Sequence, residues 1–284
     1  MTGSSIYRFT VGVVECIALL DGIAEDPVNV LMENVDLDTV EPELARYGLK
    51  KDGISSYPYT CLLIHAGSQW VLIDTGFGDI WPSCGKLPDC LEEAGVEPKE
   101  IDVVVLTHAH GDHIGGNVDK DGNILFPNAQ WVMAKKEWEF WSNLENLKDL
   151  PSRYTDFTIR KLLPIAERLK LVEEETEIVP GIFTIPLPGH TPGHLVVAVR
   201  SEGKELLYTA DAMLHPLHVD HPEWCASHWA DFDWEGVVHS RRVLYERAAA
   251  GQALVLAFHF DPFPSLGHIQ RAGESWRWVP LGES

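Results

Sequence analysis

The feature that most constrains this chain is a cluster of histidines and one aspartate directly after a short apolar run. Residues 103–106 are aliphatic and predict a buried strand, and the glycines that follow end regular structure. Within six positions lie His108, His110, Asp112 and His113. Imidazole and carboxylate groups together suit zinc and related divalent metals. Four such side chains are too many for one open catalytic metal, so the spacing predicts two ions.

The geometry of an extended chain favours the same division. Residues two apart point the same way, so His108 and His110 are expected to reach one metal. Asp112 and His113 would then turn towards the second. The alternative, a solvated loop with chance histidines, is disfavoured by the complete pattern after a β-branched strand.

Polar residues close three further apolar runs downstream. His190 follows residues 182–189, Asp211 follows 206–210, and His259 follows 253–258. Proteins of the α/β class place functional groups at strand ends. One such residue alone is ordinarily a surface residue, but the repeated pattern predicts a shared site.

These segments resemble the metallo-β-lactamase-fold hydrolase superfamily. The resemblance covers most of the chain and is carried by Asp74-Thr75-Gly76, the motif from His108 to His113, residues 189–194, Asp211 and His259. Within the superfamily the chain is most similar to the dinuclear branch that contains N-acyl-homoserine lactonases and methyl-parathion-hydrolase-like enzymes. Residues 211–216, 221–224 and 259–264 resemble the latter group.

The resemblance implies a role for each of these side chains. His108, His110 and His190 would bind one metal; Asp112, His113 and His259 would bind the other; and Asp211 would bridge both. Asp112 would also carry a proton to the leaving group, and Asp74 would orient a ligating histidine. A hydroxide shared by two metals is a nucleophile at neutral pH. The implied cofactors are two divalent ions, with zinc first and manganese, iron or cobalt as alternatives. His194 is assigned to structure.

The order of apolar runs predicts a mixed α/β chain, and the resemblance implies the four-layer αβ/βα sandwich of the superfamily. We expect a single domain over residues 1–284, because the candidate ligands run from His108 to His259. Strands are predicted near 7–19, 59–65, 69–74, 101–106, 130–134, 182–187, 194–200, 204–210 and 253–259, helices near 86–95, 135–147, 158–169 and 234–250, and a hairpin over 267–279. Residues 21–58 are the least regular and are predicted to be a lid, a dimer contact or a surface excursion.

The charge balance excludes some partners. The formal net charge is −21 and no basic patch is present, which argues against nucleic acid and against anionic membranes. The start of the chain has no secretory pattern, and no apolar run is long enough to span a membrane. The five cysteines are scattered, so reduced thiols and a cytoplasmic location are expected; a pair between Cys84 and Cys90 is the minority alternative. A homodimer is implied only by the resemblance.

Several residues of this chain differ from those of neighbouring branches of the superfamily, and these differences exclude some activities. The bridging position is Asp211 rather than the cysteine or serine of antibiotic-hydrolysing β-lactamases, and only 25 residues follow His259, too few for a glyoxalase II-type extension. The lactonase branch commonly has a tyrosine three residues after the bridging aspartate, where this chain has Leu214, so His215 or Tyr57 would have to substitute. Candidates for an apolar substrate pocket are Phe77, Trp81, His215, Trp224, Trp229 and Phe263.

The sequence therefore predicts a dinuclear hydrolase of a small apolar ester or lactone. A primary phosphotriesterase is the first alternative, and a mononuclear iron dioxygenase, a sensor or an inactive scaffold are the others. A second histidine group, with members at 215, 218, 221 and 228, is interpreted as exposed histidines near the pocket rim rather than as a third metal site or substrate clamp.

Overall fold

Two seven-stranded sheets form the centre of the molecule, each built from one half of the chain. The computed structural model describes residues 4–227 and 230–282. The first sheet has its strands in chain order: β1 (Ile6–Val11), β2 (Val14–Pro27), β3 (Ile54–Ala66), β4 (Gln69–Ile73), β5 (Ile101–Val105), β6 (Gln130–Ala134) and β7 (Leu169–Val172). Strands β4 to β7 pair in parallel, so their carboxyl ends share one edge.

The second sheet is formed by the C-terminal half of the chain. It consists of β8 (Thr176–Val179), β9 (Ile182–Pro186), β10 (Leu195–Ser201), β11 (Lys204–Tyr208), β12 (Leu254–Leu256), β13 (Leu266–Ala272) and β14 (Ser275–Pro280). β11 and β12 are its parallel pair, so the chain leaves both strands at the same edge.

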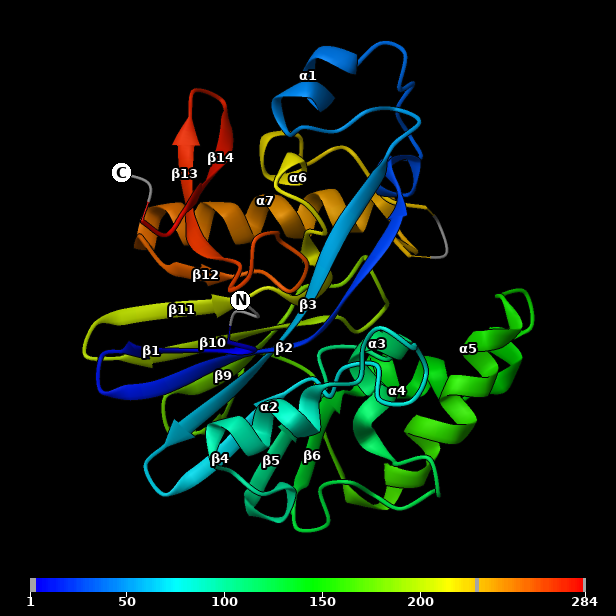
Figure 1. Ribbon diagram of the computed structural model, residues 1–284, viewed down its shortest axis with the longest axis vertical. Coiled ribbons are helices and arrows are strands. Elements are labelled where there is room, and N and C mark those ends of the chain that lie inside the picture. Colours follow the sequence, from blue (N-terminus) through cyan, green and yellow to red (C-terminus); the bar gives the residue numbers. More distant parts are fainter. Residues whose placement is uncertain (1–3, 228–229, 283–284) are drawn as a thin grey trace.

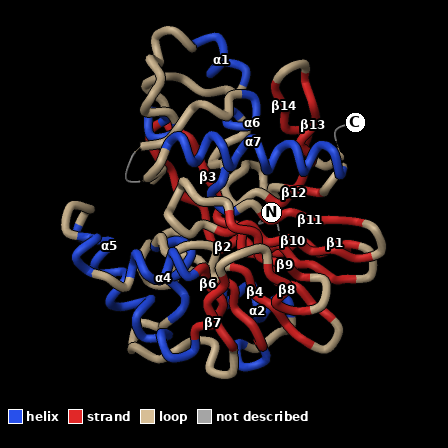
Figure 2. Tube along the Cα trace, turned by 180° about the vertical axis from the view of Figure 1, so that it is seen from behind, coloured by secondary structure: helices blue, strands red, loops and turns tan. Residues whose placement is uncertain are grey.

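Helices cover the outer faces of the sandwich (Figure 1). α2 (Leu87–Ala94) and α4 (Lys135–Trp141) pack on the first sheet, and α7 (Trp234–Gly251) with α6 (Leu217–Asp220) packs on the second. Seen from behind, the strands lie between these two groups of helices (Figure 2). The predicted αβ/βα sandwich is confirmed. One hydrophobic cluster draws side chains from both sheets, including Val104 of β5 and Val197 of β10.

Some elements differ from the prediction. The strand expected over 7–19 is the hairpin β1–β2, because Gly12 adopts a φ of 58° and turns the chain between Val11 and Val14. The helix expected over 158–169 is a π-helical turn (Thr158–Leu162) and a 3-10 segment (Leu163–Arg168) after α5 (Ser152–Phe157). Pro164 lacks the amide hydrogen that a continuing α-helix needs. The strands β7 and β8 were not predicted.

The segment 21–58 is more regular than predicted. Its ends extend β2 and β3 into a long ribbon, which carries a 3-10 turn (Val28–Leu31) and α1 (Glu41–Arg46) away from the sandwich (Figure 1). The connecting loop packs on the segment after β11: the amide of Glu33 donates to the carbonyl of Cys225 at 2.8 Å, and the Asn34 side chain donates to the carbonyl of Glu223 at the same distance. This segment is therefore fixed against the C-terminal half.

Two further expectations concern membranes and disulfides. Among the described residues, the structure contains no helix that is both long and apolar enough to cross a membrane. All five cysteines are free thiols, and Cys84 is not bonded to Cys90.

Candidate metal centre

The candidate ligands lie where strands of both sheets end. His108 and His110 lie in the loop that follows β5 of the first sheet, and Asp112 and His113 lie in the short helix α3 (Gly111–Ile114) that comes next. His190, Asp211 and His259 follow β9, β11 and β12 of the second sheet. Side chains that are far apart in the sequence therefore meet between the two sheets.

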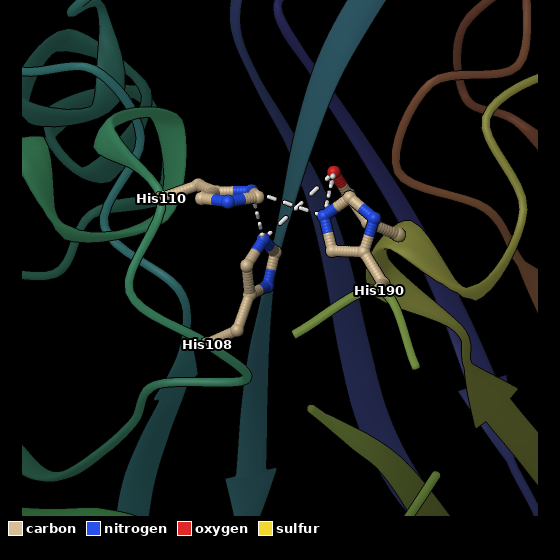
Figure 3. A group of neighbouring side chains, drawn as sticks. His108, His110 and His190 are labelled. Carbon is tan, nitrogen blue, oxygen red and sulfur yellow. Dashed lines mark hydrogen bonds and ion pairs between the residues drawn. The ribbon is translucent and has the colours of Figure 1, made fainter. Parts of the chain in front are cut away.

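Three imidazoles converge on one point (Figure 3). Nδ1 of His110 lies 3.1 Å from Nε2 of His108 and 3.0 Å from Nε2 of His190. Oδ2 of Asp211 lies 3.3 Å from the same nitrogen of His190. These four side chains are buried and form one group of atoms that could hold a metal ion.

A second group lies beside the first and shares Asp211. Its Oδ1 is 3.2 Å from Nε2 of His113 and 3.2 Å from Nε2 of His259. Oδ2 of Asp112 is 3.4 Å from the same nitrogen of His113. The two oxygens of Asp211 thus face different groups, which is the arrangement of a bridging carboxylate.

The hydrogen bonds of two rings suit bound cations. Nδ1 of His113 lies 2.8 Å from Oδ2 of Asp74, and Nδ1 of His190 lies 2.9 Å from Oδ1 of Asp231, so each carboxylate accepts that proton and leaves the Nε2 lone pair facing the centre. Burial lowers the pKa of His110 to about 3 and favours its neutral form. Burial also lowers the pKa of His113, but the carboxylates of Asp211, Asp112 and Asp74 outweigh it and raise that pKa well above its usual value, so this ring attracts positive charge. Lone pairs packed about 3 Å apart repel unless a proton or a metal cation lies between them. About 3.3 Å is the edge of a tetrahedron of ligands at zinc distance.

Asp74, predicted to orient a ligating histidine, contacts the ring of His113. It has a φ of 61°, follows β4, and is fully buried. Besides His113, it accepts hydrogen bonds from the amide of Thr107 at 2.8 Å and from the hydroxyl of Tyr208 at 3.1 Å. Its position is therefore fixed by both sheets.

Two buried carboxylates of this centre were missed by sequence reasoning. Asp231 lies just before α7; burial opposes its charge, but the hydrogen bond from His190 and the charge of Arg241 lower its pKa to about 2. Glu137 of α4 accepts from the amides of Ala109 at 2.9 Å and Gly193 at 2.8 Å, and so ties the loops that carry the three imidazoles. Their full burial distinguishes these two carboxylates from the other acidic side chains, and no motif in the sequence indicates it.

His194 has the structural role predicted for it. Its Nε2 accepts a hydrogen bond from the amide of Asp211 at 3.2 Å, and the ring is fully buried. It belongs to neither donor group among the described residues. Its contact fixes the backbone of the candidate bridging residue.

A cavity of about 330 Å³ opens onto the two donor groups. Asp112, His110, His190, Asp211 and His259 line its floor. Its walls are mostly apolar and aromatic and include Phe77 and Trp81 as predicted, together with Ala24, Val30, Leu31, Tyr57, Tyr59, Ile80, Tyr154, Phe157, Leu214 and Ala230. Asp26 and Arg153 are the charged side chains of its lining away from the donor groups. The ribbon of β2 and β3 thus supplies one wall.

Three predicted pocket residues lie outside this lining. His215 packs its ring edge-on against Tyr47 at 5.4 Å, and Trp224 stacks on His221 at 3.9 Å. Phe263 lines a separate cavity behind the loop that follows His259. Trp229 and His228 lie outside the described residues.

The second histidine group is not the exposed rim that was predicted. His218 is fully buried: its Nδ1 accepts from the amide of Leu214 at 3.2 Å, and its Nε2 lies 2.8 Å from the carbonyl of Leu31. These contacts join two walls of the cavity. Within the described part of the chain the histidines at 215, 218 and 221 form no third metal-binding group.

Comparison with known proteins agrees with this geometry. The profile of the Metallo-beta-lactamase superfamily matches residues 57–235. An N-acyl homoserine lactonase from Bacillus sp is 24% identical over 176 residues, or 55% of this chain and 64% of the relative. A Beta-lactamase-like protein 2 homolog from Drosophila melanogaster is 32% identical over 154 residues, or 54% of this chain and 46% of the relative. These matches span less than two thirds of either relative.

Two solved structures match almost the whole chain. AidC, a dizinc quorum-quenching lactonase in complex with a product, superposes with a TM-score of 0.88 at 26% identity, covering 98% of this chain and 97% of its own. The hydrolase AbOPH of the beta lactamase superfamily gives a TM-score of 0.89 at 26% identity and covers 99% of each chain. The profile spans more than half of this chain. The chain belongs to the metallo-beta-lactamase superfamily.

Proposed function

We propose that this protein is a dinuclear hydrolase of small, apolar esters or lactones. The observation that carries the proposal is the placement of Asp211, which presents one carboxylate oxygen to each of two adjacent donor groups. His108, His110 and His190 would hold one ion, and Asp112, His113 and His259 the other. Zinc is the first candidate for both ions; manganese, iron and cobalt suit the same donors.

Each part of the centre has a definite task in this proposal. Two bound divalent ions would supply Lewis acidity and ionise a shared water at neutral pH. Asp74 and Asp231 hold the imidazoles of His113 and His190 in the tautomer that points Nε2 inward. Asp112 lies on the cavity floor, where its carboxylate can pass a proton to the leaving group.

The size and apolar lining of the cavity favour a small substrate with an apolar part. Leu214 is a wall residue, so the position of the lactonase tyrosine offers no hydroxyl. Tyr57 and Tyr59 line the same cavity, and burial raises the pKa of both, which keeps the phenols protonated as hydrogen-bond donors. Of the two substitutes considered for the missing tyrosine, Tyr57 lines the cavity and His215 does not.

A phosphotriester is the second candidate substrate class. Its phosphoryl group also presents an oxygen to a Lewis acid and an electrophilic centre to hydroxide, and the aromatic walls at Phe77 and Trp81 suit aryl leaving groups.

A mononuclear dioxygenase or sensor is less well supported, because it leaves the donor group of Asp112, His113 and His259 without a role. A small-molecule substrate and a cytoplasmic homodimer complete the proposal.

Elemental analysis joined to a substrate screen tests this function. We expect about two divalent ions per chain and hydrolysis of members of an ester, lactone and paraoxon-type panel. Asp112→Asn should lower kcat at least ~100-fold, because general acid catalysis contributes about that much or more. Asp121→Asn, an exposed loop residue, is the matched control. Activity that survives both chelation and Asp112→Asn would refute the mechanism, and about one tightly bound iron per chain would favour the dioxygenase.

A further inference from the structure

Arg241 is a fully buried guanidinium on α7. Burying a cation costs several kcal/mol unless its donors are satisfied. Here they are: Nε donates to the carbonyl of Ala212 at 2.7 Å, one terminal nitrogen donates to the carbonyls of Pro222 and Trp224, and the other lies 3.4 Å from Oδ2 of Asp231. The side chain is therefore fixed from several directions.

The contacts of Arg241 lead to two candidate ligands. Asp231, which pairs with Arg241 through Oδ2, accepts the Nδ1 proton of His190 on its other oxygen at 2.9 Å. Ala212, whose carbonyl accepts from Arg241, is the residue directly after Asp211. The guanidinium of Arg241 therefore contacts one neighbour of each candidate ligand: Asp231 beside His190, and Ala212 beside Asp211.

The same helix supports the His190 loop at a second place. Ser240, the neighbour of Arg241, donates its hydroxyl proton to the carbonyl of Pro188 at 2.6 Å. α7 therefore serves as a fixed base for the loop that carries His190. Arg241 of this helix holds the carboxylate of Asp231, and Asp231 in turn holds the imidazole of His190.

We propose that Arg241 is a positioning residue for the donor group of His108, His110 and His190, and that it acts through Asp231. This inference rests on the proposed metal centre. The group of Asp112, His113 and His259 depends on Asp74 instead, which has no contact with Arg241. Arg241 reaches the first site both through Asp231 and through the backbone next to Asp211, but it reaches the second site only through the latter. Loss of Arg241 should therefore weaken the first site more than the second.

Lysine cannot replace this arginine. A guanidinium presents donors on three nitrogens in a rigid fork, whereas an ammonium offers one point of charge. No single nitrogen reaches both the carbonyl of Ala212 and the carboxylate of Asp231 in the observed arrangement. Arg241→Lys preserves the charge but removes the simultaneous contacts, which makes it the informative variant.

The test compares Arg241→Lys and Arg241→Gln with Arg242→Gln, an exposed neighbour on the same helix. Far-UV circular dichroism establishes folding, and competition with a chelator measures the Kd of each zinc ion. Both Arg241 variants should bind one of the two ions about 10–100-fold more weakly, as expected for loss of a partner that orients a ligand. Cobalt substitution should change the absorption spectrum of that site more than that of the other, and Arg242→Gln should match the wild type.

A double-mutant cycle separates positioning from simple support of the loop. Asp231→Asn should weaken the same ion, and combining it with Arg241→Lys should add little, because the two residues act in series. Additive losses, or equal weakening of both ions, would overturn the inference. If neither Arg241 variant folds, Asp231→Asn decides, since an unchanged Kd at both sites overturns the inference equally. Fewer than two ions on the wild type would instead refute the proposed function.

Discussion

At the scale of single residues, Asp74 shows how one side chain serves both fold and site. Its φ of 61° is tolerated by aspartate and asparagine better than by other side chains. Asp74→Asn therefore keeps the backbone and loses the negative charge that faces Nδ1 of His113. We expect one metal ion to bind about 10–100-fold more weakly while the fold is retained.

Chelator competition on the purified variant measures this loss. The matched control is Asp102→Asn, because Asp102 also accepts a backbone amide, that of Trp70 at 2.8 Å, but lies on the surface away from the centre. An unchanged Kd in Asp74→Asn would mean that the imidazole of His113 needs no charged acceptor.

The residues of the centre differ in how far the sequence reveals them. His108, His110, Asp112 and His113 are predictable because ligand-type side chains are dense after one apolar run. His190, Asp211 and His259 follow from repetition of that pattern at strand ends. Asp231, Glu137 and Arg241 were not predictable, since the chain has 43 acidic and 22 basic side chains and only tertiary packing shows which of them are buried.

At the scale of elements, the start of α7 links helix stability to the His190 loop. Asp233 is the N-cap, and its carboxylate accepts from the amide of Gly236 at 3.1 Å, while its own amide donates to the carbonyl of Gly189 at 2.9 Å. Asp233→Ala removes the cap and should lower the free energy of unfolding by about 1 kcal/mol.

Urea denaturation at neutral pH measures this change. Asp233→Asn should be much closer to the wild type, because asparagine caps a helix about as well as aspartate. Glu235→Ala, in the same exposed first turn, controls for loss of an acidic side chain. Equal stability of Asp233→Ala and the wild type would show that the cap contributes nothing measurable.

Elements with a strong apolar run were predicted, and those set by local backbone chemistry were not. β4, β5, β6 and α7 follow directly from their apolar patterns. The turn at Gly12 and the break before Pro164 depend on one residue each, and a pattern averaged over a window misses them. The ribbon of β2 and β3 was mistaken for irregular chain because its register depends on pairing between residues about 30 positions apart, such as Ala24 and Tyr57.

At the scale of the whole molecule, buried neutral histidines should make the fold sensitive to acid. Burial lowers the pKa of His215 to about 4 and that of His218 well below its usual value, where the nearby Arg241 adds to the effect and Asp231 opposes it. The unfolded chain protonates these histidines below about pH 6.5, while the folded chain does not. The unfolded state then binds more protons, so stability is full above pH 6.5 and falls as the pH decreases, by about 1.4 kcal/mol per pH unit for each histidine.

The variant His218→Asn tests whether a buried histidine causes the acid sensitivity. Asparagine retains an acceptor for the amide of Leu214 but cannot be protonated, so the variant should be less stable at pH 7.5 yet lose less stability on going to pH 5.5. Urea denaturation of the metal-free protein at both values measures the two differences, and metal removal keeps ligand protonation from dominating the result. Val237→Ala, a buried apolar change in α7, should lower stability while keeping the wild-type dependence on pH. If His218→Asn and the wild type lose the same free energy between the two pH values, the acid sensitivity arises elsewhere in the chain.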